Sequence, residues 1–179
     1  TNAVPDGSSR SLADIARDLG ADQIKSLTGN AAFTITPARK ASLMYIALNQ
    51  NVPVLAKPEV RQAIKWAIDY SGIQKNIVST TYDVHQAFLP AGLTSALDDR
   101  PFQQDVAKAK ALLAQAGVPD GFEIALDHTS GPPHADIAQA IQANLASVGI
   151  KVTLVAAEAR QVITKTRARQ HQMAIVRWG

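Results

Sequence analysis

The 179-residue sequence contains no cysteine. This excludes a disulfide framework, a thiolate metal site and a cysteine nucleophile, and it leaves the redox compartment open. No apolar run approaches the roughly 20 residues that a membrane-spanning helix needs. The first residues also lack the basic-then-apolar layout of a signal peptide. We therefore expect a soluble chain that, if it is exported, has already been trimmed.

Several catalytic motifs are also missing from the sequence. It has no Gly-rich phosphate loop, no Gly-x-Ser-x-Gly elbow and no His-Glu-x-x-His metal motif. An enzyme would need a nucleophile or a base with an orienting partner, and the sequence offers only scattered candidates. These absences favour a protein that is not an enzyme and that carries no cofactor and no metal.

Positive charge is spread thinly along the chain, which carries a formal net charge of +3. One denser group of basic residues comprises Arg160, Lys165, Arg167 and Arg169. Without interleaved aromatic residues such a group is typical of a solvated helix face, so we expect no nucleic-acid binding.

The length and the 46% hydrophobic content suffice to bury a sizeable core as one domain. We expect residues 1–30 to be a lead-in with short helices, including one over residues 11–20 and a further turn or two over residues 22–27. Residues 31–179 should form a single α/β lobe.

Residues 58–69 (PEVRQAIKWAID) are the clearest helix in the sequence. Val60, Ile64 and Ile68 recur at helical spacing, so one face is apolar and should be buried. Pro58 suits a first helical position, and Glu59 places negative charge where the helix dipole favours it. We expect Trp66 to flank the apolar stripe and to cover an edge of the core.

Further helices are expected on either side of a long ordered loop over residues 79–104, which lacks any sustained period. Asp105 should cap one of them, with Gly117 ending it. Asn144 falls on the apolar face of another, where backbone or water should satisfy its amide. The expected helices cover residues 71–78, 105–116, 133–148 and 157–169.

Alternating or continuous apolar runs predict the strands, which cover residues 32–36, 43–48, 122–127, 150–155 and 173–178. The first two should pair or lie adjacent. Residues 122–155 read as a strand, a helix and a strand, a unit whose crossover is right-handed and whose strands are parallel. The fold class is therefore α/β, with a mixed sheet flanked by helices.

The loop over residues 127–134 joins the carboxyl end of a strand to the start of a helix. Open α/β sheets bind ligands beyond such ends, and a helix amino terminus favours an anion such as a peptide carboxylate. An ordinary capped loop is the alternative. His128 and His134 lie six residues apart in this loop, but a metal would need further ligands, so we expect both to face solvent.

Three sequence segments, taken in their order along the chain, resemble the extracellular solute-binding proteins of the dipeptide, oligopeptide and nickel ABC transporters. They are YIALN at residues 45–49, the helix at residues 58–69, and AKAKALLAQAGVPDGF at residues 107–122. The resemblance implies one lobe, the one nearer the carboxyl terminus, of a two-lobed periplasmic binding protein-like fold, truncated at its carboxyl end. Such proteins close two lobes around a solute and deliver it to a membrane permease.

By its motifs, the resemblance implies ligand-binding roles for Trp178 at the crevice, Tyr45 before the Leu-Asn strand end, and His134 in the cleft-side loop. The chain departs from the family where Ile175 stands in place of an arginine found in some members, and where the family's Gly-x-Phe-Asp reads Gln-His-Gln-Met at residues 170–173. The implied partners are a small solute, with a peptide favoured, the missing amino-terminal lobe of the same protein, and an ABC transporter permease. The implied protein is a monomer and is periplasmic, or extracellular and membrane-anchored.

Two other functions remain open at this point. One is a small α/β enzyme domain that uses the loop of His128 and His134. The other, more distant, is a basic nucleic-acid module. The bound solute itself is not predicted, because specificity in the resembling family lies in a few cleft side chains drawn from both lobes.

Overall fold

The computed structural model describes residue 16 and residues 19–179, and the chain divides into two compact units, residues 1–36 and 37–179. In the first unit, helix α1 (Ala21–Leu27) begins after Gly20, whose backbone N–H donates to the side-chain oxygen of Gln23 at 2.9 Å. This confirms the predicted turns over residues 22–27. The helix expected over residues 11–20 falls mostly outside the described residues.

The strand predicted at residues 32–36 is wrong, because these residues form no strand and their apolar side chains Phe33 and Ile35 are exposed. The Phe33 backbone N–H instead donates to the Asn30 carbonyl in a turn. An alternating run becomes a strand only when another strand pairs with it, and the predicted partner at residues 43–48 pairs with the distant residues 173–178.

The second unit is built on a four-stranded sheet in the order β1-β4-β2-β3. Its strands are β1 (Leu43–Leu48), β2 (Glu123–Thr129), β3 (Lys151–Ala157) and β4 (Met173–Trp178). Strand β1 runs antiparallel to β4, whereas β2 is parallel to both β3 and β4. The sheet is therefore mixed, and the predicted parallel pair of strands joined through a helix is confirmed.

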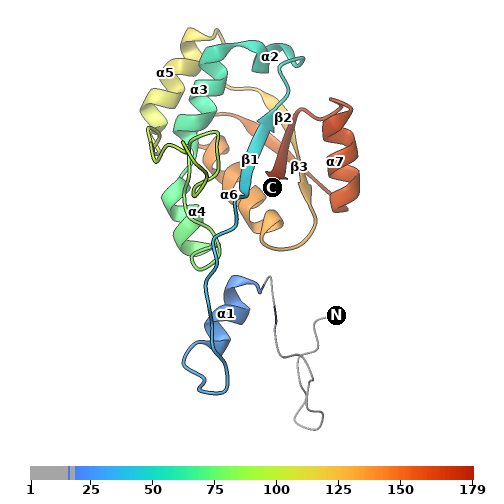
Figure 1. The fold of residues 1–179 in the computed structure, drawn as a ribbon. Helices are drawn as coiled ribbons and strands as arrows, with labels where there is room; N and C mark the ends of the chain where they lie inside the picture. Colours follow the sequence, from blue (N-terminus) through green and yellow to red (C-terminus); the bar gives the residue numbers. More distant parts are fainter. Residues whose placement is uncertain (1–15, 17–18) are drawn as a thin grey trace. The chain divides into compact units, whose positions relative to one another are not determined.

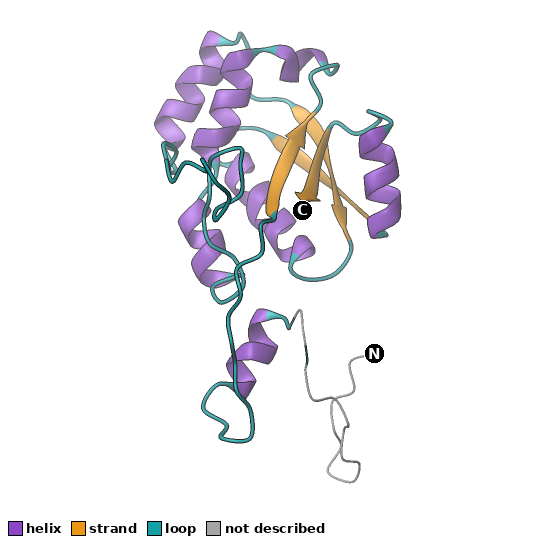
Figure 2. Cartoon of the chain, in the orientation of Figure 1, coloured by secondary structure: helices purple, strands orange, loops and turns teal. Residues whose placement is uncertain are grey.

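Helices cover both faces of this sheet (Figure 1). Helices α3, α5 and α6 lie on one side, with α3 packed against α5, and α7 lies on the other (Figure 2). The helices of this unit are α2 (Pro53–Ala56), α3 (Pro58–Ala67), α4 (Tyr70–Asn76), α5 (Val106–Gln115), α6 (His134–Ala146) and α7 (Ala159–Arg167). None of the helices that the structure describes is long and apolar enough to cross a membrane.

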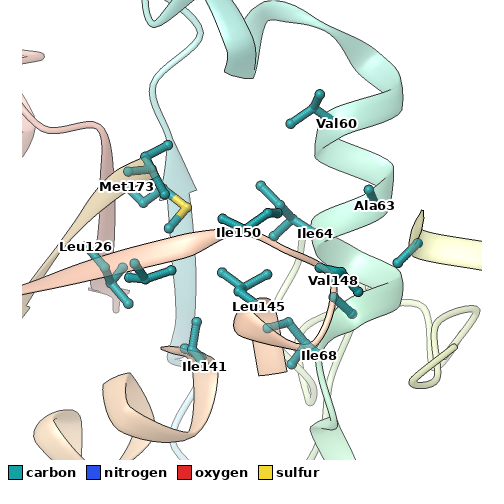
Figure 3. Close-up of a cluster of buried hydrophobic side chains, with 14 of the residues drawn as sticks. Val60, Ala63, Ile64, Ile68, Leu126, Ile141, Leu145, Val148, Ile150 and Met173 are labelled. Carbon is teal, nitrogen blue, oxygen red and sulfur yellow. The ribbon is translucent and has the colours of Figure 1, made fainter. Parts of the chain in front are cut away.

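Helix α3 supplies one wall of the core, as its apolar spacing predicts (Figure 3). Val60 and Ile64 are buried on it, and Ile68 directly after it packs in the same cluster as Val148 and Ile150. Burying each such side chain contributes about 1.5–3 kcal/mol relative to an exposed reference. The helix ends at Ala67, earlier than predicted, because Asp69 caps the next helix by accepting the Gly72 N–H at 2.8 Å.

Residues 79–104 contain neither helix nor strand, as predicted, and side-chain bonds hold the loop in place. The Gln86 amide donates to the Phe102 carbonyl and accepts from the Phe102 N–H, both at 2.8 Å. The Phe102 ring meets Trp66 edge to face at 5.3 Å, and the Lys108 ammonium lies 3.5 Å from the centre of the Trp66 ring. Trp66 is thus half-buried at the edge of the core, as expected.

Two local signals read from the sequence are also confirmed. The Asp105 carboxylate caps α5 by accepting the Lys108 N–H at 2.8 Å, and Gly117 follows the helix with a φ of 75°. Asn144 is satisfied by backbone, because its Oδ1 accepts the N–H of Asp69 at 2.9 Å.

Candidate functional site

The carboxyl ends of the parallel strands β2 and β4 meet at one edge of the sheet, where ligands bind in open α/β folds. Trp178 is the last residue of β4 and is 54% exposed. Trp178 is therefore not part of the buried core. The site role of Trp178 remains an expectation.

Tyr45 and Trp178 share one face of the sheet. Tyr45 lies opposite Val176 and Leu43 lies opposite Trp178 in the antiparallel pair, so the two aromatic residues are diagonal neighbours on adjacent strands. Diagonal neighbours of this kind lie about 7–8 Å apart, and somewhat less at Cβ, within reach of aromatic rings. Tyr45 is 43% exposed, so the pair presents an open aromatic surface.

His134, the third predicted site residue, lies beside the other face of the sheet. It is the first residue of α6, the helix that packs on the core side with Ile137 and Ile141. Burial lowers the pKa of His134, and the neighbouring His128 and Arg177 lower it further. The three predicted residues thus surround one edge of the sheet, with the aromatic pair on one face and His134 on the other.

His128 does not face solvent, so that expectation is wrong. It lies within β2 and is 4% exposed, and its Nδ1 donates to the Thr129 carbonyl at 3.0 Å. The reason is strand alternation, which places His128 on the same face as the buried Ile124 and Leu126. Among the described residues, no group of three or more potential ligands could hold a metal ion with it.

Arg177 is a further candidate site residue that the sequence did not single out. It alternates with Trp178 along β4, lies opposite Met44, and donates to the Ser42 hydroxyl at 3.2 Å. None of the ion pairs within the described part of the chain includes it. The signal available in the sequence was an arginine near the end of an otherwise apolar strand.

On the α7 side, the sequence expectation for the basic group is wrong at Lys165. Arg160, Arg167 and Arg169 are exposed, but the Lys165 ammonium turns inward and lies 2.6 Å from Oδ1 of Asp127, a carboxylate that is 2% exposed. Strand alternation places Asp127 beneath α7, on the face of Ala174. A buried carboxylate needs a cation, and Lys165 is in place to supply it.

A hollow of about 530 Å³ opens beside this ion pair, between α7 and the β2–β3 side of the sheet. Val155, Ala157 and Val162 contribute its apolar lining, and Gln161 and Arg160 are among its polar residues. None of Tyr45, His134 and Trp178 lines it, so the hollow is separate from the predicted site.

The fold is shared with several solved structures. The periplasmic binding protein DppA from Helicobacter pylori in complex with peptide STSA superimposes with a TM-score of 0.71 at 30% identity, over 77% of this chain and 27% of that one. A dipeptide-binding protein from Pseudoalteromonas in complex with Met-Leu gives a TM-score of 0.78 at 22% identity, over 89% of this chain and 33% of that one. The fold is therefore that of a periplasmic binding protein.

The sequence comparisons agree with that class. The family described as "Bacterial extracellular solute-binding proteins, family 5 Middle" matches residues 11–179, and the chain belongs to this family. It is 30% identical to the glutathione-binding protein GsiB of Pectobacterium atrosepticum over 150 residues, which are 83% of this chain and 29% of the relative. It is 28% identical to the dipeptide-binding protein of Escherichia coli over 140 residues, 75% of this chain and 26% of the relative.

The chain therefore spans less than a third of the length of these relatives. The relatives are binding proteins rather than enzymes, and they work outside the cytoplasm.

Proposed function

We propose that this chain is a solute-capture lobe of an ABC transporter substrate-binding protein. With a second lobe of the same protein it closes on a peptide or a peptide-like solute and delivers it to a membrane permease. It works in the periplasm, or outside the cell on a membrane anchor, as a monomer and without catalysis. The observation that carries this proposal is the family match over residues 11–179, together with relatives named for binding dipeptides and glutathione.

The solute contacts Trp178, Tyr45 and His134 at the carboxyl edge of the sheet. Support for the aromatic pair comes from exposure, because large apolar side chains left open on one face mark contact surfaces. A half-exposed tryptophan at a strand end is well placed to be covered when a second lobe closes, as two-lobed receptors do around their ligands.

The anionic end of the solute is held on the other side of this edge. Arg177 helps to lower the pKa of His134, and His134 begins a helix of 13 residues whose amino-terminal dipole favours an anion. A guanidinium binds a carboxylate through two parallel hydrogen bonds. A peptide carboxylate placed here would give Arg177 the charged partner that it lacks within the described residues.

The test compares a dipeptide with its carboxamide in calorimetric titrations of the full-length protein that contains this chain. The wild type should prefer the free carboxylate by about 2–5 kcal/mol, the cost of truncating one partner of a hydrogen-bonded charge pair. Arg177→Gln should remove most of this preference, and Arg160→Gln, an exposed arginine on α7, should keep it. A wild-type protein that binds neither ligand contradicts the proposed function. Equal affinity for both ligands contradicts only the anion subsite.

A further inference from the structure

Helix α7 is held on the sheet by few apolar contacts. Val162 is its one buried residue, whereas α6 buries Ile137, Ala138, Ile141 and Leu145. Apart from the exposed Ala159 and Ile163, the other residues of α7 are polar, and the helix flanks a hollow open to solvent. Its attachment to β2 and β4 therefore depends strongly on polar interactions.

The ion pair of Lys165 with Asp127 is the charged interaction of this kind. Oδ1 of Asp127 accepts from the Lys165 ammonium at 2.6 Å, and the carboxylate is almost fully buried in the sheet. Oδ2 of the same carboxylate is buried and has no hydrogen-bond partner among the described residues. A buried charge without its partner is costly, so displacing Lys165 would destabilise the packed position of α7.

His171 lies in the turn between α7 and β4, and both partners of the ion pair influence the pKa of its ring. It is 7% exposed, and its Nδ1 is buried without a hydrogen-bond partner among the described residues. The charged groups that influence the pKa of His171 are Asp127 of β2 and Lys165 of α7. On the β1 side the neighbour is Asn49, an uncharged side chain that donates to the carbonyls of Arg169 and His171 at 2.9 and 2.7 Å.

We propose that Lys165, Asp127 and His171 form a proton-sensitive lock that holds α7 against the sheet. The lock is closed when Lys165 is paired with Asp127 and His171 is neutral. It weakens when His171 takes up a proton, because a second cation then competes with the partly exposed Lys165 for one buried carboxylate. This lock does not depend on the identity of the solute.

The direction of the pH effect follows from the environment of His171. Burial lowers its pKa below the ordinary 6.5; Asp127 raises it in part, and Lys165 lowers it again. Opening of α7 exposes the ring, restores the ordinary pKa and so takes up a proton below that value. The lock is therefore complete above pH 6.5 and weakens as the pH falls below it.

Hydrogen exchange of the full-length protein, followed by mass spectrometry at about pH 7.5 and about pH 5.5 and corrected for intrinsic rates, tests this directly. The opening equilibrium of residues 158–170 should rise by up to about tenfold for each pH unit below the ordinary histidine pKa. Residues 134–146 of α6 should not change over the same range. His171→Gln should abolish the pH dependence in α7, and Arg160→Gln should keep it.

A second pair of variants tests the ion pair itself. Lys165→Met should raise the opening equilibrium of α7 by about tenfold or more at about pH 7.5. Adding Asp127→Asn should reverse part of this increase, because it removes the uncompensated charge. The inference is overturned if α7 opens equally at both pH values in the wild type, if His171→Gln retains the pH dependence, or if Lys165→Met leaves α7 as protected as before.

Discussion

Asn144 of α6 accepts the backbone N–H of Asp69 at 2.9 Å and so ties α6 to the junction between α3 and α4. Asp69 at the same time caps α4 with its carboxylate. One side-chain amide therefore fixes the point at which the chain leaves the core wall and starts a new helix.

Asn144→Ala should destabilise the fold by about 1–3 kcal/mol, because it leaves the Asp69 N–H without its acceptor at a partly buried position. Urea unfolding followed by circular dichroism measures this. The exposed Gln139 on the same helix supplies the control, and Gln139→Ala should stay within about 0.5 kcal/mol. Equal midpoints for the two variants would show that the bond contributes nothing.

Ile64→Ala should cost about 2–5 kcal/mol, as other large-to-small changes in cores do. Ile64 is 3% exposed and packs in the main cluster (Figure 3). The exposed Gln62 is a better control on α3 than Lys65, whose ammonium lies 4.9 Å from the centre of the Phe102 ring. Gln62→Ala with a loss as large as that of Ile64→Ala would mean that the buried face of α3 is misassigned.

Tyr70 should make the fold sensitive to alkali. Burial raises the pKa of Tyr70 from 10.0 to about 12, because the tyrosinate form is disfavoured inside the protein. The unfolded chain therefore releases this proton first, so the contribution of Tyr70 to stability is present below pH 10.0 and is lost between that value and about 12. Tyr70→Phe should flatten the stability profile in this window, and an unchanged slope in that variant would refute the assignment.

Gln86→Ala should release the long loop at its base, because this one amide makes both hydrogen bonds to the backbone of Phe102. We expect faster limited proteolysis within residues 79–104, with the global free energy of unfolding lowered by about 1–3 kcal/mol at most. Gln103 is an exposed neighbour at the same end of the loop, and the protease should cleave Gln103→Ala at the same rate as the wild type. Identical cleavage of Gln86→Ala and the wild type would show that the clamp does not hold the loop.

The sequence alone was sufficient to predict those helices and strands whose local pattern agrees with their burial in the fold. The apolar spacing in α3, the Asp105 cap of α5 and the alternation in β3 all appear in the structure at the predicted places. Here the local pattern and the tertiary environment favour the same conformation, so one can be read from the other.

The failures occurred where the outcome depended on a partner far away in the chain. The run at residues 32–36 has strand composition, but the strand that it was expected to join pairs with β4. Lys165 looks like a surface lysine until Asp127, 38 residues earlier, is brought beneath it. Likewise, Arg177 comes near enough to influence the pKa of His134 only because β4 lies beside β2 in the sheet.

The central claim is that this chain captures a solute at the edge of the sheet marked by Trp178. Calorimetric titration of the full-length protein with dipeptides and glutathione, comparing the wild type with Trp178→Ala and with Trp66→Phe, tests it most directly. We predict that Trp178→Ala weakens binding by about 2 kcal/mol or more, as loss of a buried aromatic anchor does, with Trp66→Phe close to the wild type. Unchanged affinity in Trp178→Ala, or no binding of any of these ligands by the wild type, would contradict the account.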